Sequence, residues 1–230
     1  MNNSQQILQA LEEQDLVKAE HYFVKALEND PSELLYELAT YLEGIGFYPQ
    51  AKEIYLKIVE DFPDVNLNLA AIASEDGQIE EAFAYLEEIQ ADSDWYVSAL
   101  ALKADLYQME GLTDVAREKL FEALTYSEDP LLILGLAELD SELENYQEAI
   151  KGYAQLDNRT IYEQTGISTY QRIGFAYAQL GKFETAIEFL EKALELEYDD
   201  LTAFELASLY FDKEEYQKAV LYFKQIDTIS

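Results

Sequence analysis

The sequence predicts an all-α fold made of about seven helical hairpins. Two observations support this: a small residue recurs along the chain at spacings of 32, 31, 34, 33, 37 and 33, and no segment alternates like a strand. The recurring residue is alanine, in the order Ala19, Ala51, Ala82, Ala116, Ala149, Ala186 and Ala219. A self-similar period of this length is typical of proteins in which each repeat is one supersecondary unit.

The residues around each alanine predict the second helix of a hairpin. Apolar side chains stand three residues before, four after and seven after it; in the sixth unit they are Phe183, Leu190 and Ala193. This spacing places them on one stripe of an α-helix. We expect the alanine to mark a helix crossing too close for a larger side chain. Second helices are predicted near residues 15–29, 48–61, 79–90, 113–126, 146–156, 183–197 and 216–227.

The first helix of each hairpin precedes a turn. First helices are predicted near residues 4–13, 33–45, 64–76, 95–110, 131–143, 167–180 and 201–213. Glycine marks the turn in four units, at Gly46, Gly77, Gly111 and Gly181. In the other units Gln14, Asn145 or Glu215 falls at or next to the same place.

The spacing of 37 residues leaves additional residues at positions 157–166, between units five and six. The simplest interpretation is a lengthened loop. The alternative is a local hinge, or a tongue that contacts a partner.

The sixth unit carries a recognisable motif. It contains, in order, Gly174, Tyr177, Leu180, Gly181, Lys182, Phe183, Ala186, Leu190 and Ala193. In this respect the chain resembles the tetratricopeptide repeat (TPR) proteins, and more generally the small acidic TPR proteins of Gram-positive bacteria. Two departures are visible: Tyr198 replaces the usual terminal proline, and Asp140 stands where an aromatic residue is normal.

The resemblance covers essentially the whole chain and implies a single domain, a right-handed superhelical solenoid. The approximate repeats are residues 1–31, 32–62, 63–96, 97–129, 130–166, 167–199 and 200–230. In this family the first helices line a concave groove and the second helices form the convex back. The positions that this places on the groove are Leu8, Tyr36, Thr40, Leu67, Ala71, Ala101, Asp105, Leu134, Glu138, Gln171, Phe175, Phe204 and Phe211. Trp95 is either a groove-edge contact or a staple between adjacent repeats.

The charge balance favours a particular kind of partner. The chain has 47 acidic and 15 basic residues, a net charge of −32, so nucleic acid and anionic membranes are poor partners. Within the predicted first helices the only cations are Lys103, Arg172 and, at the last position of the seventh, Lys213. Where some family members clamp a carboxylate with cations, this chain has Glu37, Thr40, Asn68 and Asp105. We therefore expect a basic or amphipathic protein segment as ligand; alternatively, the negative charge serves only solubility.

Most catalytic chemistry is disfavoured. There is no cysteine and a single histidine, His21, so we expect no catalytic residues, no metal and no cofactor. Nucleotide-binding glycine motifs are absent, and the many carboxylate pairs are uninformative in so acidic a chain. Residues 1–14 do not resemble a signal peptide, which favours a soluble cytoplasmic protein.

The sequence thus predicts a non-catalytic scaffold or adaptor that binds an extended or helical segment in its groove. One alternative is a peptide-sensing regulator that acts through a second protein; another, favoured least, is an acidic hydrolase. The apolar run Val220, Leu221 and Tyr222 near the C-terminus further suggests that the last repeat is covered by a second copy or a partner. The alternative is a monomer whose lysines make a sufficient outer face.

Overall fold

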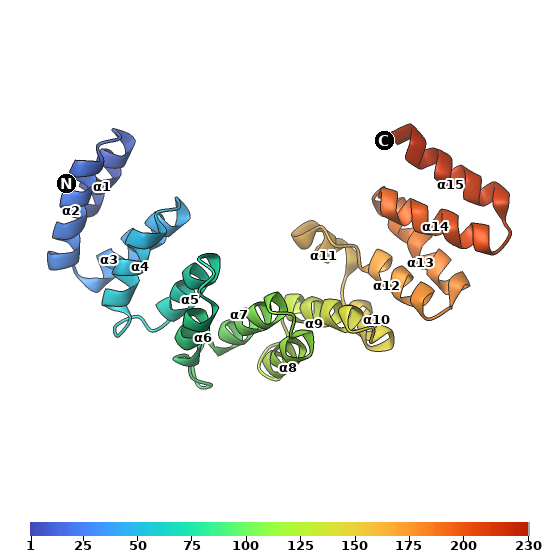
Figure 1. Cartoon of the computed structure of the whole chain (residues 1–230), viewed down its shortest axis with the longest axis horizontal. Helices are drawn as coiled ribbons and strands as arrows, with labels where there is room; N and C mark the ends of the chain where they lie inside the picture. Colours follow the sequence, from blue (N-terminus) through green and yellow to red (C-terminus); the bar gives the residue numbers. More distant parts are fainter. Residues whose placement is uncertain (230) are drawn as a thin grey trace. The chain divides into compact units, whose positions relative to one another are not determined.

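The computed structural model describes the backbone of residues 1–229 and the side chains of residues 1–226. Over that part of the chain the secondary structure is 15 α-helices without a strand, which confirms the predicted all-α class (Figure 1). The helices divide into two compact units, Met1–Leu106 and Tyr107–Ser230, here called unit 1 and unit 2. The prediction of a single domain stays a prediction.

Unit 1 consists of three helical hairpins followed by most of α7. Its helices are α1 (Asn3–Glu12), α2 (Leu16–Asn29), α3 (Ser32–Gly44), α4 (Tyr48–Ile58), α5 (Val65–Glu75), α6 (Ile79–Glu87) and α7 (Tyr96–Met109), which ends in unit 2. The two helices of each hairpin pack against each other, and α4 also packs on α5. The core therefore runs from one hairpin to the next, as stacked repeats require.

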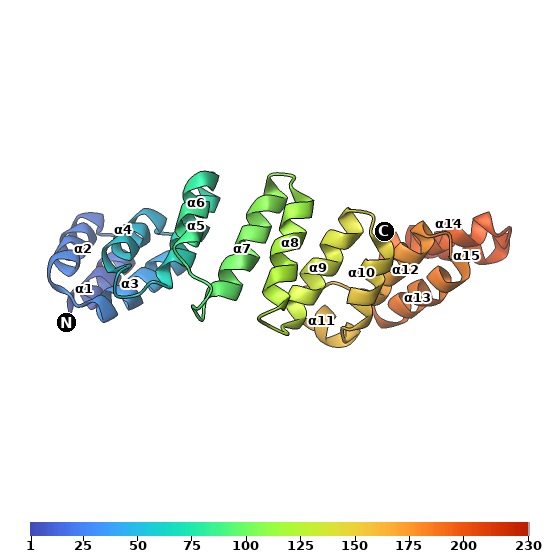
Figure 2. The same ribbon diagram turned by 90° about the horizontal axis from the view of Figure 1, so that it is seen from below.

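Unit 2 continues the same pattern. Its helices are α8 (Thr113–Leu124), α9 (Pro130–Glu142), α10 (Tyr146–Ala154), α11 (Asn158–Thr165), α12 (Thr169–Gln179), α13 (Phe183–Leu196), α14 (Asp200–Asp212) and α15 (Tyr216–Ile229). The hairpins α9/α10, α12/α13 and α14/α15 pack within themselves, while α8 contacts α9, α10 contacts α12 and α13 contacts α14 (Figure 2).

The predicted register is confirmed. All seven register alanines are buried, with exposed fractions between 0% and 7%. The apolar residue four positions later is also buried in the hairpins of the core, for example Tyr55, Tyr153 and Leu190. Each alanine therefore marks the stripe along which a second helix meets its neighbours.

The turns share one backbone conformation. The four predicted turn glycines have φ between +74° and +88°, in the left-handed region. The other three turns reach this region with Gln14 (φ 59°), Glu144 (φ 63°) and Glu214 (φ 61°). In two of them the left-handed residue therefore stands one position before Asn145 and Glu215, the neighbours named from the sequence.

The prediction of a lengthened loop between the fifth and sixth repeats is wrong, because these residues form helix α11. The side chain of Asp157 caps its start by accepting a hydrogen bond from Thr160 N (3.0 Å), and Gly166 ends it at φ 75°. Ile161 is buried against Tyr153 and Ile173, so α11 contributes to the core of unit 2. The alternative of a hinge or a partner-contacting tongue stays a prediction.

Candidate functional site

The first helices of unit 2 border an open pocket of about 560 Å³. Its lining comes from the end of α7, from α9 and the start of α10, and from α12 and α14. Aromatic and apolar groups are supplied by Tyr146, Phe175 and Leu201. The charged groups are Glu138, Glu142, Glu205 and Arg172. We call this pocket the unit 2 groove.

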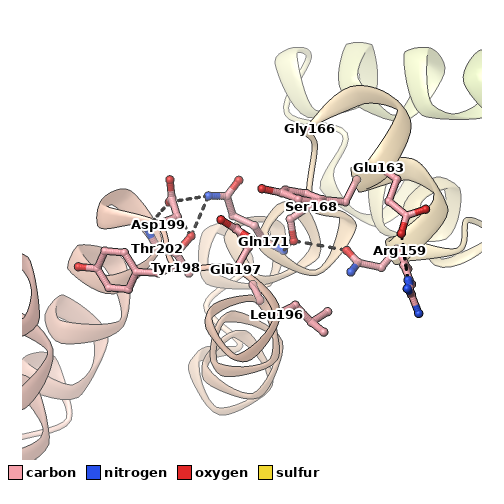
Figure 3. A pocket seen from close by; sticks show the side chains of 13 residues that line it. Arg159, Glu163, Gly166, Ser168, Gln171, Leu196, Glu197, Tyr198, Asp199 and Thr202 are labelled. Carbon is pink, nitrogen blue, oxygen red and sulfur yellow. Dashed lines mark hydrogen bonds and ion pairs between the residues drawn. The ribbon is translucent and has the colours of Figure 1, made fainter. Parts of the chain in front are cut away.

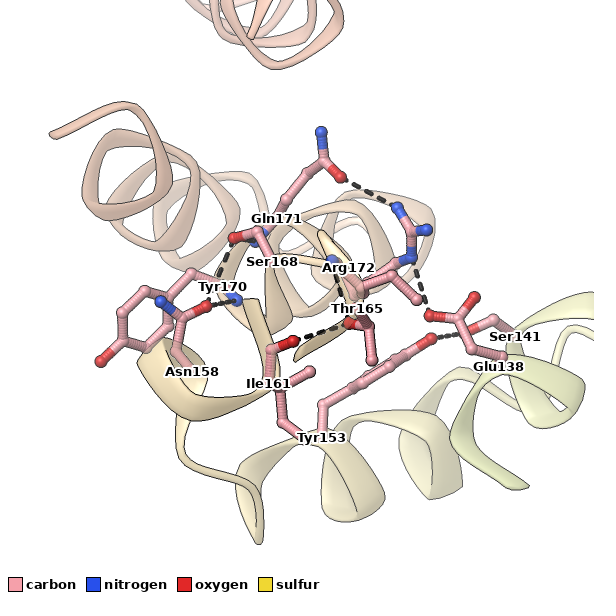
Figure 4. Close-up of polar contacts among 11 residues, drawn as sticks. Glu138, Ser141, Tyr153, Asn158, Ile161, Thr165, Ser168, Tyr170, Gln171 and Arg172 are labelled. Atoms are coloured by element: carbon pink, nitrogen blue, oxygen red, sulfur yellow. Dashed lines mark hydrogen bonds and ion pairs between the residues drawn. The ribbon is translucent and has the colours of Figure 1, made fainter. Parts of the chain in front are cut away.

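A chain of hydrogen bonds that begins in the groove joins three first helices and ends at the second pocket described below. Arg172 on α12 donates from Nε to Glu138 Oε1 on α9 (2.9 Å) and from Nη1 to Gln171 Oε1 (2.9 Å). Gln171 Nε2 in turn donates to Asp199 Oδ2 (2.9 Å) and Thr202 Oγ1 (2.7 Å) at the start of α14. Figure 4 shows the part of this chain around Arg172. The only cation of the groove is therefore already paired with a carboxylate of the same protein.

The other two carboxylates of the groove have no cation. Glu142 accepts hydrogen bonds from Gln108 Nε2 (2.9 Å) and Thr113 Oγ1 (3.2 Å), both neutral donors. Among the residues with described side chains, neither Glu142 nor Glu205 forms an ion pair. The groove thus combines an aromatic surface with an excess of negative charge.

A buried tyrosine contacts a helix that lines the groove. The hydroxyl of Tyr153 on α10 lies 3.2 Å from Ser141 Oγ on α9 (Figure 4). A tyrosine hydroxyl is protonated at neutral pH, and burial raises the pKa of Tyr153 further above its ordinary value. It can therefore hydrogen-bond the groove side of α9 without adding charge.

A second pocket of about 510 Å³ lies between α11 and the connection from α13 to α14 (Figure 3). It is lined by Tyr162 and Tyr198 together with acidic side chains. Arg159 is largely solvent-exposed and pairs with Glu163 one helical turn away (3.0 Å). This pocket was not predictable from the repeat pattern, because it is lined by residues of α11, a helix outside that pattern.

Several of the predicted groove residues are together in unit 2. Glu138 and Phe175 line the unit 2 groove, and Gln171 lines the second pocket. Phe204 and Phe211 are 52% and 56% exposed. Each makes an edge-to-face ring contact within the last hairpin, with Phe223 and Tyr216 respectively. These two rings therefore lie on the surface without lining the groove pocket.

The structure contradicts one predicted groove residue. Leu134 is 5% exposed and packs in the core with Tyr153 and Ile173, so its side chain is not offered to a ligand. Its position on the repeat is the same as that of the half-buried Gln171 and of the exposed Phe204, so the position alone does not decide whether a side chain is accessible.

In unit 1 the predicted residues Tyr36, Thr40 and Leu67 lie on first helices and are exposed or half-buried. Tyr36 donates from its hydroxyl to Asp64 Oδ2 (2.7 Å), and Thr40 Oγ1 donates to the carbonyl oxygen of Tyr36 (2.9 Å). This face therefore presents a fixed aromatic ring beside a carboxylate.

The remaining predictions concern the residues around the start and middle of α7. Trp95 is 42% exposed just before α7, and its backbone N donates to Ser93 Oγ (3.1 Å). Asp105 is exposed. Lys103, counted from the sequence as a first-helix cation, is buried. It pairs with Glu87, the last residue of α6 (2.9 Å). Its charge therefore does not face an open groove.

Comparison with known families identifies the class of protein. Residues 36–97, 167–200 and 202–230 match models of the tetratricopeptide repeat, and residues 108–161 match the model of YpiA-like tetratricopeptide repeats. Together with the helical hairpins and their register, these matches show that the chain is a tetratricopeptide repeat protein. Proteins of this fold generally serve as scaffolds for protein interactions.

One curated relative is a bacterial member of the class. The chain is 35% identical over 126 residues to the TPR repeat-containing protein YpiA of Bacillus subtilis (strain 168). The match covers 54% of this chain and 30% of the relative, so it spans less than a third of that protein. The predicted resemblance to Gram-positive TPR proteins is confirmed.

Solved structures share the fold. A MamA protein superposes with a TM-score of 0.62 at 20% identity, covering 71% of this chain and 88% of that one. MamA from Desulfovibrio magneticus RS-1 gives 0.61 at 18% identity (72% and 93%), and PilF of Pseudomonas aeruginosa gives 0.58 at 24% identity (72% and 75%). At these identities the likeness concerns the fold alone. In the part of this chain that the structure describes, no helix has the length and apolar character needed to cross a bilayer.

Proposed function

We propose that this protein is a non-catalytic scaffold whose unit 2 groove binds a protein segment with apolar and basic side chains. The observation that carries the proposal is the pair of carboxylates, Glu142 and Glu205, beside Phe175 and Leu201 without a cation of their own. An amphipathic segment would supply both an apolar face and the missing positive charge.

The two kinds of contact play different parts. Covering Phe175 and Leu201 removes apolar surface from water, worth about 25 cal/mol per Å² before the costs of association. Each exposed ion pair adds only about 0.2–1 kcal/mol, but it disfavours acidic ligands and speeds encounter. Affinity would therefore come mainly from the aromatic surface, and selectivity for basic segments from the glutamates.

The test is calorimetric titration with a synthetic amphipathic helical peptide of leucine and lysine. We expect binding that weakens as salt rises to about 0.15 M, where the screening length is ~8 Å. Glu205→Gln should lower the affinity up to about fivefold, the equivalent of one exposed pair. Glu188→Gln, which removes the same charge from the exposed face of α13, is the matched control and should change little.

Two results would contradict the proposal. One is equal binding of a peptide in which glutamate replaces every lysine, because the groove would then not select for positive charge. The other is an equal effect of Glu205→Gln and Glu188→Gln, because the charge would then act through the protein as a whole.

Self-association through the last repeat and a cytoplasmic location stay predictions. Val220 and Leu221 on α15 are 46% and 64% exposed, as an uncovered last repeat requires. Sedimentation at high concentration would decide the first, since a purely monomeric protein would rule it out.

A further inference from the structure

Another open pocket of unit 2, of about 550 Å³, is bordered by α8, α9 and α10 (Figure 1). It shares no residue with the unit 2 groove. Its lining includes Phe121 and Leu124 on α8, Leu136 on α9 and Gly152 on α10. Phe121 is 58% exposed, and within the described side chains no other aromatic ring contacts it. We call this space the α8/α10 pocket.

In the two repeats that follow, the equivalent place is filled by a pair of aromatic rings. The residues nine before and three after the register alanine are Tyr177 and Phe189 in one repeat. They are Tyr210 and Tyr222 in the other. The rings of each pair stack, with centroids 5.8 Å apart in both cases. An isoleucine of the preceding second helix packs in the same core cluster, so each pair lies between its own hairpin and that helix.

The α9/α10 repeat lacks this aromatic pair. The same two positions hold Asp140 and Gly152. Asp140 is 3% exposed and accepts a hydrogen bond from Nε of Arg117 on α8 (2.5 Å). Arg117 itself occupies the position at which the next two second helices have Ile150 and Ile187. An ion pair therefore replaces the contact of isoleucine with a ring, and the α8/α10 pocket is the space that the second ring would fill.

The chain cannot fill this space with a larger side chain at Gly152. A Cβ atom added there would lie 2.9 Å from Cβ of Ala137 on α9, closer than carbon atoms approach in a packed core. A ring at position 152 would therefore push α10 away from α9. The close contact of these two helices leaves the pocket open to a group from outside.

Arg117 is suited to contact an aromatic group in the pocket. Its hydrogen bond to Asp140 is the only one that its guanidinium donates to the described residues, so Nη1 and Nη2 have no acceptor among them. A guanidinium held in place by one nitrogen can lie over the face of a ring or donate to a phenol oxygen. Phe121 can add a stacked or edge-to-face contact.

We infer that the α8/α10 pocket is a docking site for an aromatic side chain, tyrosine or phenylalanine, of a protein ligand. The incoming ring would take the place that Phe189 and Tyr222 hold in the next two repeats. Aromatic side chains that fill a pocket in this way are the usual anchors of protein interfaces. The inference is independent of the proposed function, because it concerns other residues and a ligand group without charge.

The experiment follows the methyl groups of Leu124 and Leu136 by NMR in the full chain, during titration with N-acetyltyrosine amide. We expect both to shift, because a ring beside a methyl group changes its resonance. The dissociation constant should be on the order of 1 mM for so small a ligand. N-acetylleucine amide should bind about three- to tenfold more weakly, since it gains neither the cation–π nor the ring–ring contact.

A double variant fills the pocket from within. Arg117→Ile combined with Asp140→Tyr reproduces the residues of the next two repeats and removes both partners of the buried ion pair together, so no buried charge is left alone. We expect the shifts caused by N-acetyltyrosine amide to be lost in this protein. The leucine–lysine peptide should still bind, because the unit 2 groove keeps its residues.

A single variant at the surface tests the same site without disturbing the core. Phe121→Ala should lower the affinity for N-acetyltyrosine amide about two- to tenfold, the equivalent of one ring–ring contact. Leu56→Ala is the matched control, because Leu56 occupies the same repeat position on α4 in unit 1 and is 48% exposed. It should leave the affinity unchanged. Thermal unfolding followed by circular dichroism shows whether each variant is folded.

Three results would overturn the inference. They are unshifted methyl groups of Leu124 and Leu136, equal affinities for the tyrosine and leucine amides, and unchanged binding of the tyrosine amide by the folded double variant. Should the double variant not fold, equal affinities of Phe121→Ala and Leu56→Ala would decide against the site. The proposed function would stand in each case, because it is tested with the leucine–lysine peptide alone.

Discussion

Gly174 on α12 lies in close contact with α13, and Gly174→Ala tests that contact directly. A methyl group added at Gly174 would stand 2.6 Å from Cγ and Cδ2 of Leu190, and 3.2 Å from the carbonyl oxygen of Ala186. Leu190 is fully buried, so it cannot turn into solvent to make room. The helices would have to move apart.

Two effects of opposite sign set the magnitude. Alanine is a better helix former than glycine by about 1 kcal/mol, which favours the variant. Overpacking a close-packed core costs about 1–3 kcal/mol, and contacts with both a buried side chain and a backbone carbonyl place this site in the upper part of that range. We therefore expect a net loss of about 1–2 kcal/mol, or roughly 2–8 °C in melting temperature for a chain of this length.

Gly44→Ala is the matched control. Gly44 is also helical, and no atom lies within 4 Å of the position that its methyl group would take. We expect this variant to be unchanged or more stable by up to about 1 kcal/mol. Urea unfolding followed by circular dichroism at 222 nm (a helix signal) compares the two. If Gly174→Ala proved as stable as Gly44→Ala, the helix crossing would be looser than described and the reasoning would be wrong.

Four further predictions follow from the packing, the turns and the charges. Ala149→Leu should lower stability by about 1–3 kcal/mol, measured by thermal unfolding, because the alanine is fully buried at a helix crossing. Glu144→Gly should raise the free energy of unfolding by about 0.5–1 kcal/mol, and with it the urea midpoint, because it relieves a left-handed backbone (φ 63°). Burial and the hydrogen bond to Glu81 raise the pKa of Tyr85 from 10.0 to about 12, so the folded chain holds the hydroxyl proton more tightly than the unfolded chain does. The stability that this proton contributes should be complete below pH 10 and lost as pH rises toward 12. Urea unfolding at a series of alkaline pH values measures this loss. Moderate salt should raise the melting temperature, because it screens repulsion within a chain of charge −32; an unchanged midpoint would mean that the charges are better compensated than their number suggests.

The sequence was sufficient for the repeat architecture because the register alanines carry the packing information themselves. Ala51 and Ala186 are fully buried because two helices approach each other closely there. The same close approach is what the recurring alanine predicts. The turn residues were predictable to within one position. Polar residues can occupy a left-handed turn as glycine does, and nothing local distinguishes Glu144 from Asn145.

The sequence around α11 contains local capping signals for a helix, which the repeat period does not reveal. Asp157 three residues before Thr160 and the later Gly166 are an N-cap and a C-terminal stop, and together they predict a short helix. The interpretation as a loop followed from treating the additional length only as a departure from the repeat. Local capping chemistry was the better guide here.

The site could be predicted only in part, because partners in space decide what a charge does. Asp140, noted as an unusual acid at an aromatic position, is buried and bound by Arg117 Nε (2.5 Å), so it is part of the core. Lys103 is buried against Glu87 in the same way. The groups that carry the proposed function, Glu142 and Glu205, are distinguished by lacking a cation among the described side chains, and a sequence does not show which acids lack one.

The hydrogen bonds of Gln171 and Arg172 have a consequence for how the repeats fold together. These neighbouring side chains on α12 reach in opposite directions, Arg172 back to α9 and Gln171 forward to α14. Repeat proteins gain cooperativity from terms between nearest neighbours, and such terms are usually apolar. Here a polar contribution is added to both interfaces of the same repeat. The repeat containing α12 therefore couples its neighbours, and loosening it should let the hairpins on either side unfold more independently.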